Sequence, residues 1–276
     1  MTSTWLITGS SRGLGRALAE AVLAAGHRLV ATARNPDALH DLVERFPETV
    51  RAVALDVTDP AAAQRAVQTA VEAFGGLDVL VNNAGYGDVG SVEDTSLEAF
   101  RAQIETNLFG TLILTKAAIP VMRVQRSGRI LQLSSVGGRL GAPGRAAYSA
   151  AKWGVEGFTE SLALEMALIG VHVTLVEPGG FRTDFAGSST SLQEGRADYD
   201  AVVGAAARRQ RAYDGQQPGD PARAAQVLLD LASMDAPPLR LALGSDAFAA
   251  ISAADAARLA ERDRWRALTE STDFAL

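Results

Sequence analysis

The chain has 276 residues, of which 47% are hydrophobic and 21% charged, a composition typical of ordinary globular proteins. Its formal net charge is −6 at pH 7, because 26 lysines and arginines stand against 32 aspartates and glutamates. A negative surface repels phosphates, so we expect no nucleic-acid or anionic-membrane partner. The absence of cysteine excludes disulfides, thiol nucleophiles and cysteine-ligated metal or iron–sulfur sites.

The N-terminal segment lacks the features of a targeting sequence. Trp5, Leu6 and Ile7 lead directly into a glycine turn, without the basic region and cleavage site of a signal peptide. No apolar run approaches the roughly 20 residues that a membrane span needs. We therefore expect a cytoplasmic protein with no membrane partner.

Short apolar runs alternate with stretches of helical periodicity along most of the chain. The predicted strands are Trp5–Thr8, Arg28–Ala33, Arg51–Leu55, Asp78–Val81, Arg129–Ser134, Val171–Val176 and Leu239–Leu243. The predicted helices are Leu14–Ala25, Pro36–Phe46, Pro60–Phe74, Leu97–Arg123, Ala147–Ile169, Pro221–Leu231 and a last helix after Ser245. This alternation predicts an α/β protein with a doubly wound Rossmann fold, in which helices flank both faces of a parallel sheet of about seven strands.

The organisation along the chain favours one domain, although the length alone suggests two domains of about 150 residues. No linker, fixed-period repeat or low-complexity tract divides the sequence, so we expect a single Rossmann domain over 1–276. Strand periodicity disappears in residues 184–217, and an irregular insertion of this length is typical of a lid or a disordered segment. We expect a substrate-binding lid there, and a C-terminal helical extension over 245–276.

A glycine-rich turn follows the first predicted strand and leads directly into a helix. Glycine lets the backbone turn sharply and approach a ligand closely, and the helix N-terminus presents unpaired N–H groups and a positive dipole to an anion. A dinucleotide pyrophosphate fits this arrangement, although the spacing differs from the common G-x-G-x-x-G. A purely structural turn is the alternative. The candidate cofactor-binding residues here are Thr8, Gly9, Ser11, Arg12, Gly13, Leu14 and Gly15.

The end of the second predicted strand indicates which nicotinamide cofactor binds. Proteins that bind NAD usually carry Asp or Glu here for the ribose hydroxyls, but residues 28–36 contain no acid. Arg34 at this position can pair with a 2′-phosphate, and Arg12 in the glycine turn can approach the same group. The sequence therefore favours NADP(H) over NAD(H), unless both arginines are solvated surface charges.

Two more segments end strands at the same predicted edge of the sheet. Asp56, with Val57 beside it, is positioned to accept a hydrogen bond from an adenine amino group. Its alternative role is to cap the next helix, for which Asp59 is better placed. The candidate cofactor residues after the fourth strand lie in the run Asn82-Asn83-Ala84-Gly85, and are Asn83, Ala84 and Gly85.

Tyr148 and Lys152 lie four residues apart in a predicted helix, so their side chains share one face. A free tyrosine has a pKa near 10, and a neighbouring ammonium favours its phenolate, so the pair can do acid–base work. A packing tyrosine beside a solvated lysine is the alternative. Ser135 at a strand end and Asn107 within a helix add a hydroxyl and an amide, and the segment from Pro178 to Thr183 supplies a turn after the sixth strand.

These motifs in this order resemble the short-chain dehydrogenase/reductase family, in its single-domain branch. The resemblance covers about residues 4–183 motif by motif, and the tail is similar to the 17β-hydroxysteroid dehydrogenase-like group. It implies a catalytic tetrad of Asn107, Ser135, Tyr148 and Lys152. It also implies that the cofactor contacts include Tyr148, Lys152, Pro178, Gly179, Phe181 and Thr183, with Thr183 at the nicotinamide carboxamide.

The resemblance implies reversible hydride transfer between NADP(H) and a small-molecule carbonyl or alcohol. Tyr148 would donate a proton to the forming alkoxide, whose oxygen Ser135 holds. Lys152 would bind the ribose and lower the pKa of the tyrosine, and Asn107 would hold a water molecule. The alternatives are an NAD-dependent alcohol dehydrogenase and a non-catalytic regulator that senses NADP(H).

Fewer residues indicate what the substrate is, whether the chain pairs with a second copy, and whether it binds a metal. Five apolar side chains are candidates for a pocket that accepts a hydrophobic substrate, or for contacts that pack the lid: Val89, Val136, Leu140, Phe181 and Phe185. Relatives pair their long apolar helices, here Leu97–Arg123 and Ala147–Ile169, so we expect a homodimer or homotetramer. The three histidines are scattered without metal-ligand spacing, so we expect no metal.

Overall fold

The computed structural model describes residues 2–185, 187 and 190–274. Three of the segments predicted from the sequence therefore include residues that lie outside the described part of the chain. These are Met1 in the domain over 1–276, residues 186, 188 and 189 in the lid, and residues 275–276 in the C-terminal extension.

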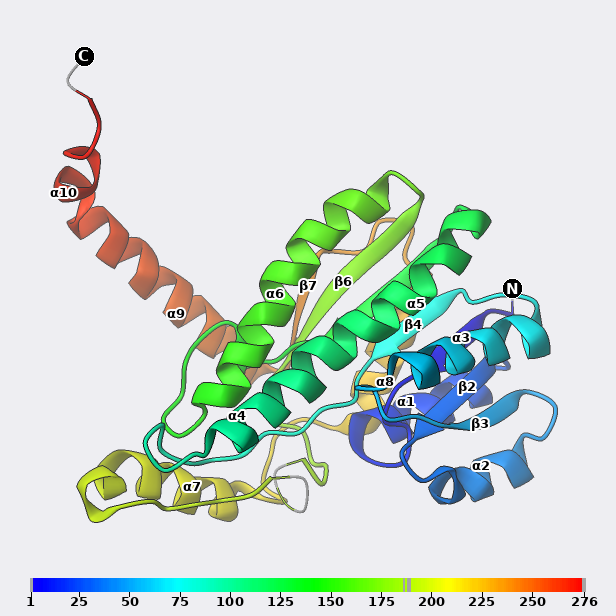
Figure 1. The fold of residues 1–276 in the computed structure, drawn as a ribbon, viewed down its shortest axis with the longest axis horizontal. Helices are drawn as coiled ribbons and strands as arrows, with labels where there is room; N and C mark the ends of the chain where they lie inside the picture. Colours follow the sequence, from blue (N-terminus) through cyan, green and yellow to red (C-terminus); the bar gives the residue numbers. More distant parts are fainter. Residues whose placement is uncertain (1, 186, 188–189, 275–276) are drawn as a thin grey trace.

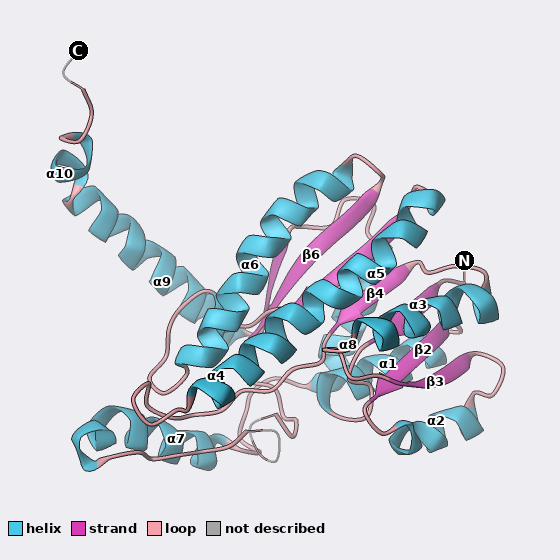
Figure 2. Ribbon diagram, in the orientation of Figure 1, coloured by secondary structure: helices cyan, strands magenta, loops and turns pink. Residues whose placement is uncertain are grey.

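Within the described residues, seven strands form one parallel sheet in the order β3-β2-β1-β4-β5-β6-β7 (Figures 1 and 2). The strands are β1 Thr4–Ile7, β2 Arg28–Ala33, β3 Val50–Ala54, β4 Val79–Asn82, β5 Gly128–Leu133, β6 Val171–Pro178 and β7 Arg240–Leu243. The predicted doubly wound Rossmann fold is therefore confirmed, with each predicted strand present and its ends shifted by at most two residues.

Helices connect the strands and cover both faces of the sheet (Figure 2). The α-helices of the described residues are α1 Gly13–Ala24, α2 His40–Arg45, α3 Pro60–Phe74, α4 Leu97–Ile104, α5 Gly110–Gln125, α6 Ala146–Ala167, α7 Ala205–Tyr213, α8 Pro221–Ser233, α9 Ser245–Arg264 and α10 Arg266–Glu270. Short helical turns lie at η1 Pro36–Leu39, η2 Glu105–Phe109, η3 Val136–Gly138, η4 Ala197–Tyr199 and η5 Asp200–Gly204.

Alternate residues of the strands point to two separate hydrophobic cores. Trp5 and Ile7 of β1 pack into the core that α1, α2 and α8 cover. Leu6, between them, packs into the opposite core, under α3, α5 and α6. Because both faces of the sheet are buried, the strands read as apolar runs with little polar alternation.

The strand order reverses between β1 and β4, which both pair with parallel neighbours at the centre of the sheet. The connections after β1 and β4 leave the sheet in opposite directions, so their carboxyl ends separate. Such a reversal leaves a crevice beyond the carboxyl ends of the strands, where doubly wound proteins bind ligands. The fold therefore fixes the place of the site before any side chain is considered.

The second half of the segment over 184–217 is helical, contrary to the prediction of an irregular insertion. Residues 197–213 form η4, η5 and α7, and α7 is rich in alanine and arginine, which favour helix. In α7 only Ala207 is buried, so the helix has almost no apolar stripe for a periodicity argument to detect. Arg208 holds the helix through ion pairs with Asp200 and Glu194.

The long helix predicted over Leu97–Arg123 contains a change of winding. A π-helical turn, η2, separates α4 from α5 and carries Asn107 inside it. Single π turns occur mostly within α-helices and often at functional sites, because the extra residue re-aims side chains. Neither composition nor periodicity marks this turn in the sequence.

The helical stretch Leu97–Gln125 is long and apolar enough to cross a membrane by length and composition alone, contrary to the expectation from the sequence. In this structure, however, Leu114, Ala118 and Met122 of α5 are fully buried in the core beneath the sheet. A core helix of a globular protein meets the same criteria of length and hydropathy.

The first turn of α1 passes so close to the preceding loop that only glycine fits at position 15. A Cβ atom on Gly15 would collide with the Gly9 carbonyl oxygen and with the Asn83 side-chain nitrogen. Gly9 and Gly13 have φ of +70° and +61°, a left-handed conformation that glycine adopts without strain. The glycine spacing is therefore set by backbone geometry as well as by any ligand.

We predict that Gly15→Ala lowers the free energy of unfolding by about 1–3 kcal/mol, because backbone must move to admit the methyl group. Gly157→Ala is the matched control, since Gly157 lies exposed within α6 with open space around its Cβ position. That change should raise stability by about 0.5–1 kcal/mol. Urea unfolding measures both variants, and a Gly15→Ala protein as stable as the wild type would contradict the close approach.

Candidate active site

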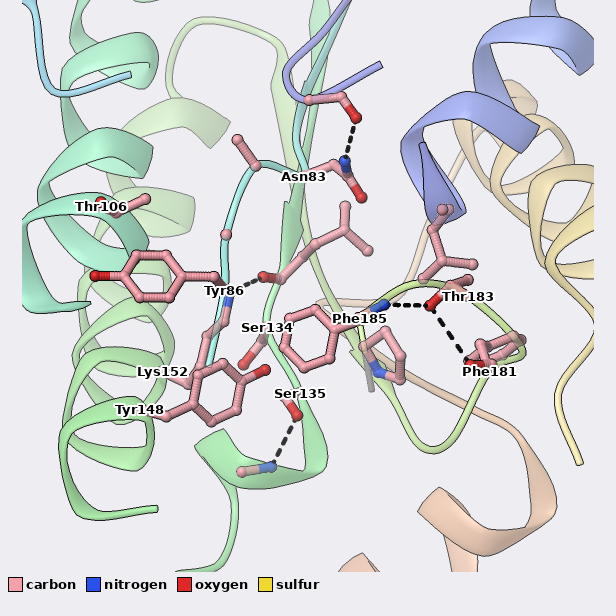
Figure 3. A pocket seen from close by; sticks show the side chains of 18 of the residues that line it. Asn83, Tyr86, Thr106, Ser134, Ser135, Tyr148, Lys152, Phe181, Thr183 and Phe185 are labelled. Carbon is pink, nitrogen blue, oxygen red and sulfur yellow. Dashed lines mark hydrogen bonds between the residues drawn. The ribbon is translucent and has the colours of Figure 1, made fainter. Parts of the chain in front are cut away.

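A cavity of about 1090 Å³ lies at the carboxyl ends of the strands, between the glycine turn and the segment after β6. Most of the residues predicted to bind cofactor or to act in catalysis line it (Figure 3). Those that do so are Gly9, Ser11, Arg12, Gly13, Leu14, Arg34, Asp56, Val57, Asn83, Ala84, Gly85, Ser135, Tyr148, Lys152, Pro178, Gly179, Phe181 and Thr183. Thr8, Gly15 and Asn107 stand behind this lining and hold it in place.

Thr8 and Asn83 lock the glycine turn to the loop after β4. The Thr8 hydroxyl accepts hydrogen bonds from the backbone N–H groups of Asn83 and Ala84, each at 2.9 Å. In return, the Asn83 side-chain amide donates to the carbonyl oxygens of Thr8 at 2.8 Å and Gly9 at 3.2 Å. The amide is therefore bonded within the protein, while the residue itself lines the cavity.

The end of the cavity near β2 carries two exposed arginines and one aspartate. Arg34 follows β2, and Arg12 precedes the first turn of α1. Asp56 accepts hydrogen bonds from the backbone N–H of Thr58 at 2.9 Å and from its hydroxyl at 2.7 Å. These bonds hold the pKa of Asp56 below its ordinary value, and the charge of Arg34 adds to the effect. Asp59 caps α3, as the sequence predicts.

Lys152 is the buried cation at the centre of the site. Its side chain is 96% buried on α6, and its ammonium donates a hydrogen bond of 2.6 Å to the carbonyl oxygen of Leu133 at the end of β5. Burial disfavours the charged form and lowers the pKa of Lys152 to about 8, although the Glu156 carboxylate one turn along α6 opposes this shift.

Tyr148 lies one turn before Lys152 on α6 (Figure 3), and its ring packs between two glycines. A Cβ on Gly87 would lie 2.9 Å from one edge of the ring, and a Cβ on Gly137 would lie 2.9 Å from the other. Burial raises the pKa of Tyr148, while hydrogen bonding with Ser135 and the charge of Arg145 lower it. From the sequence we expect Lys152 to lower the pKa of Tyr148. In the structure the cation that lowers it is Arg145.

Ser135 stands beside the tyrosine at the start of η3. Its hydroxyl accepts a hydrogen bond of 3.0 Å from the backbone N–H of Gly137, which fixes the side chain in the loop after β5 (Figure 3). The hydroxyl hydrogen is free of that bond, because the oxygen acts as acceptor. The serine can therefore donate to a substrate oxygen that lies next to the Tyr148 hydroxyl.

Asn107 supports the site from behind rather than lining it. The side chain is fully buried, and its amide donates to the carbonyl oxygens of Tyr86 and Gln103, each at 2.9 Å. Its oxygen accepts from the backbone N–H of Tyr86 at 3.2 Å. A Cβ on Gly85 would lie 2.5 Å from this oxygen and 3.8 Å from the Lys152 nitrogen, so glycine keeps the space between them open.

The turn after β6 closes the cavity over the first turn of α1. A Cβ on Gly13 would lie 3.5 Å from the Cβ of Thr183, so two segments far apart in sequence meet here. The Thr183 hydroxyl accepts from the backbone N–H of Phe185 at 3.4 Å. The Gly180 N–H donates to the Asp246 carboxylate at 2.7 Å, which ties the turn to the start of α9.

The apolar side chains predicted to form a substrate pocket divide into two groups. Val136, Phe181 and Phe185 line the cavity, whereas Leu140 is half-buried and does not line it. Val89 is instead 98% buried and pairs with Leu192 in a backbone bridge that attaches the lid segment to the loop after β4.

The sequence prediction gave no individual role to Arg145 or Asp246, which line the cavity, and it included Gln217 only as the last residue of the lid. Gln217 and Asp246 lie beyond the recognised motifs, so only the fold brings them here. Arg145 did carry a signal, since it stands one helical turn before Tyr148. No group of three or more His, Asp or Glu side chains suited to a metal occurs in residues 2–185, 187 and 190–274.

Comparisons with known proteins point to one family. A sequence profile described as short chain dehydrogenase matches residues 3–194. "Oxidoreductase BOA17" of Botryotinia fuckeliana is 46% identical over 270 residues, which are 98% of this chain and 98% of that protein. A short-chain dehydrogenase from Streptomyces avermitilis has a TM-score of 0.93 at 40% identity, covering 99% and 100% of the two chains. An alcohol dehydrogenase from Thermococcus sibiricus, complexed with 5-hydroxy-NADP, has a TM-score of 0.71 at 26% identity, covering 88% and 96%.

We predict that the burial of Lys152 makes stability rise with pH above about pH 8. In the folded protein the pKa of Lys152 is about 8, against a reference value of 10.5. Between these values the unfolded chain binds a proton that the folded protein has released, so the free energy of unfolding increases with pH. Lys152→Met removes this titration, and the stability of the wild type relative to the variant should grow from pH 8 to pH 10.

Lys116→Met is the matched control, because Lys116 is an exposed lysine on α5. Urea unfolding of the three proteins at several pH values measures the effect. A stability difference between wild type and Lys152→Met that stays constant across this range would contradict the buried ammonium.

Proposed function

The chain belongs to the short-chain dehydrogenase/reductase family, and within it we propose an NADP(H)-dependent oxidoreductase that acts on a ketone, an aldehyde or a secondary alcohol. The observation that carries the proposal is that Ser135, Tyr148 and Lys152 line the same cavity as the glycine turn. The proposed proton donor, Tyr148, and the backbone of the glycine turn, which is suited to bind an anion, therefore line one cavity.

The residues present suit a dinucleotide. Gly15 leaves no room for a side chain between α1 and the loops around it, so the backbone of the turn stays accessible at the helix N-terminus. The cavity of about 1090 Å³ is slightly larger than the usual range of about 300–1,000 Å³ for ligand sites, which suits a dinucleotide together with a small substrate. Thr183 and Phe181 would bound the nicotinamide end, and Arg34 the adenosine end.

Bound NADPH supplies the hydride, and this chain's side chains supply and direct the proton. In the reductive direction the Tyr148 hydroxyl donates its proton to the oxygen of the substrate as that oxygen gains negative charge. Ser135 donates a hydrogen bond to the same oxygen, which stabilises the developing charge. Burial keeps Tyr148 protonated at neutral pH, because it raises the pKa of the phenol.

Lys152 would bind the cofactor and restore the proton of Tyr148, and Asn107 would hold the backbone of the site in place. The Lys152 ammonium, bonded to the Leu133 carbonyl, has further N–H groups available for the ribose hydroxyls of the cofactor. The ammonium can also return a proton to the tyrosine, since the pKa of Lys152 is about 8. Asn107 fixes the backbone at Tyr86, and we assign it a positioning role.

Arg34 supports the choice of NADP(H). It stands at the carboxyl end of β2, lines the cavity, and has no acidic residue in 28–36 to repel a phosphate. A guanidinium is well matched to a phosphate because its N–H groups form a planar fork. The similar alcohol dehydrogenase from Thermococcus sibiricus was solved with 5-hydroxy-NADP. The two alternatives are an NAD-dependent dehydrogenase and a non-catalytic sensor, and a comparison of activity with NADPH and NADH distinguishes them.

We further propose a homodimer or homotetramer located in the cytoplasm. Val124 of α5, Leu164 of α6 and Leu168 after it are each more than three-quarters exposed, and Phe109 and Trp153 are about half exposed. A second copy of the chain would cover this apolar surface. Sedimentation equilibrium measures the mass, and a monomer at micromolar concentration would refute the assembly.

The likeness to the 17β-hydroxysteroid dehydrogenase-like group stays a prediction.

We predict that the protein reduces carbonyl compounds with NADPH at a higher kcat/KM than with NADH. Arg34→Ala should lower kcat/KM for NADPH by about 10- to 100-fold, because it removes charge-assisted hydrogen bonds worth about 1.5–3 kcal/mol. The value for NADH should change little. Arg123→Ala at the far end of α5 is the matched control. A preference for NADH in the wild type would reject the cofactor assignment, and cofactor binding without any turnover would indicate a sensor.

A further inference from the structure

Arg145 is a cation of the cavity lining that lowers the pKa of Tyr148 but has no ligand in the proposed function. It immediately precedes α6, is half-buried and lines the cavity. Its guanidinium carbon lies 5.8 Å from the centre of the Tyr148 ring. Arg12 and Arg34, which face the adenosine end, lie next to α1 and β2 at the other side of the sheet's reversal.

Local structure gives no reason for an arginine at this position. The residue that caps a helix N-terminus is usually Ser, Thr, Asp or Asn, because a side-chain oxygen satisfies a free N–H group. Arg145 makes no such bond, and the first turn of α6 has no acidic residue to pair with it. A cation at this end of a helix is also opposed by the helix dipole.

The guanidinium is only partly satisfied by the protein. Its one hydrogen bond to a described residue runs from Nη1 to the carbonyl oxygen of Gly87 at 3.1 Å, and no carboxylate of the described chain forms an ion pair with it. The charge of Asp88 acts on the guanidinium, but the Asp88 carboxylate accepts a hydrogen bond from the backbone N–H of Ser191. A guanidinium has five N–H donors, so most of its capacity remains open.

The neighbouring glycines let the guanidinium and Ser135 lie close to Tyr148. A Cβ on Gly87 would lie 3.0 Å from Nη1 of Arg145 and 2.9 Å from one edge of Tyr148. A Cβ on Gly137 would approach the other edge of the ring, on the side where Ser135 stands. The guanidinium lies over the ring of Tyr148 and Ser135 stands beside the Gly137 edge of that ring, so both side chains adjoin the proposed proton donor.

We propose that Arg145 binds a carboxylate carried by the substrate, so that the enzyme acts on oxo acids and the matching hydroxy acids. The inference rests on the proposed function and specifies its substrate class. A planar guanidinium matches a carboxylate through paired hydrogen bonds, and a partly buried cation gains most from an anionic partner. Val136, Phe181 and Phe185 remain available for the carbon skeleton.

The carboxylate takes no part in the redox step. The carbonyl carbon gains a hydride from NADPH and becomes a secondary alcohol, NADPH becomes NADP⁺, and the carbonyl oxygen gains the Tyr148 proton. Arg145 orients the substrate so that its carbonyl oxygen lies between Tyr148 and Ser135. Loss of this orientation should lower kcat/KM, because the charge pair contributes both to substrate affinity and to the geometry of the reacting groups.

The test compares short-chain 3-oxo and 4-oxo carboxylic acids with their methyl esters, at saturating NADPH. The wild type should have a higher kcat/KM for each acid than for its ester. Arg145→Gln should reduce kcat/KM for the acids by about 10- to 100-fold more than for the esters. Arg145→Lys keeps the charge without the planar fork, and should give an intermediate loss. Arg123→Gln, which removes a charge at the far end of α5, should leave the acid-to-ester ratio unchanged.

The acid-to-ester ratio separates substrate recognition from an indirect effect on Tyr148. If Arg145 only supports the tyrosine, Arg145→Gln lowers turnover of acid and ester by the same factor, and the inference is overturned while the proposed function stands. A wild type that prefers the esters overturns it as well. If the protein binds NADPH and reduces neither class nor any other carbonyl, the proposed function itself fails.

Discussion

A buried ammonium is the constraint around which the rest of the site is arranged. Lys152 is held in the interior by the carbonyl oxygen of Leu133, where β5 ends. A charge removed from water is costly unless polar groups surround it. The parallel register of β4, β5 and β6 fixes that carbonyl, and α6 packs along the face of the sheet so that Lys152, one turn after Tyr148, reaches it.

Charges behind this ammonium connect it to the rest of the fold. Glu156, one turn further along α6, pairs with Arg240 of β7 at 3.1 Å. Arg240 also pairs with Glu177 of β6, which in turn pairs with Arg139 in the loop after η3. Because these groups come from one helix, two strands and one loop, they fix the segment of Ser135 against the helix of Tyr148.

Much of the architecture could be predicted because local signals and tertiary structure agree. The bounds of β2 and α3 match the sequence prediction, since apolar runs and the Asp59 cap mark them. The glycine turn was recognised because backbone geometry there requires glycine. What the sequence could not give depends on tertiary contacts: the π turn around Asn107, the helix α7 without an apolar stripe, and the charge that Arg145 places beside Tyr148.

The central claim is that Tyr148 donates the proton during carbonyl reduction, and Tyr148→Phe tests it most directly. The change removes one hydroxyl and keeps the ring packed between Gly87 and Gly137. NADPH binding, followed by fluorescence titration, should stay close to that of the wild type, while kcat for carbonyl reduction should fall by at least about 100-fold. A Tyr148→Phe protein that binds NADPH and keeps near wild-type turnover would contradict the account.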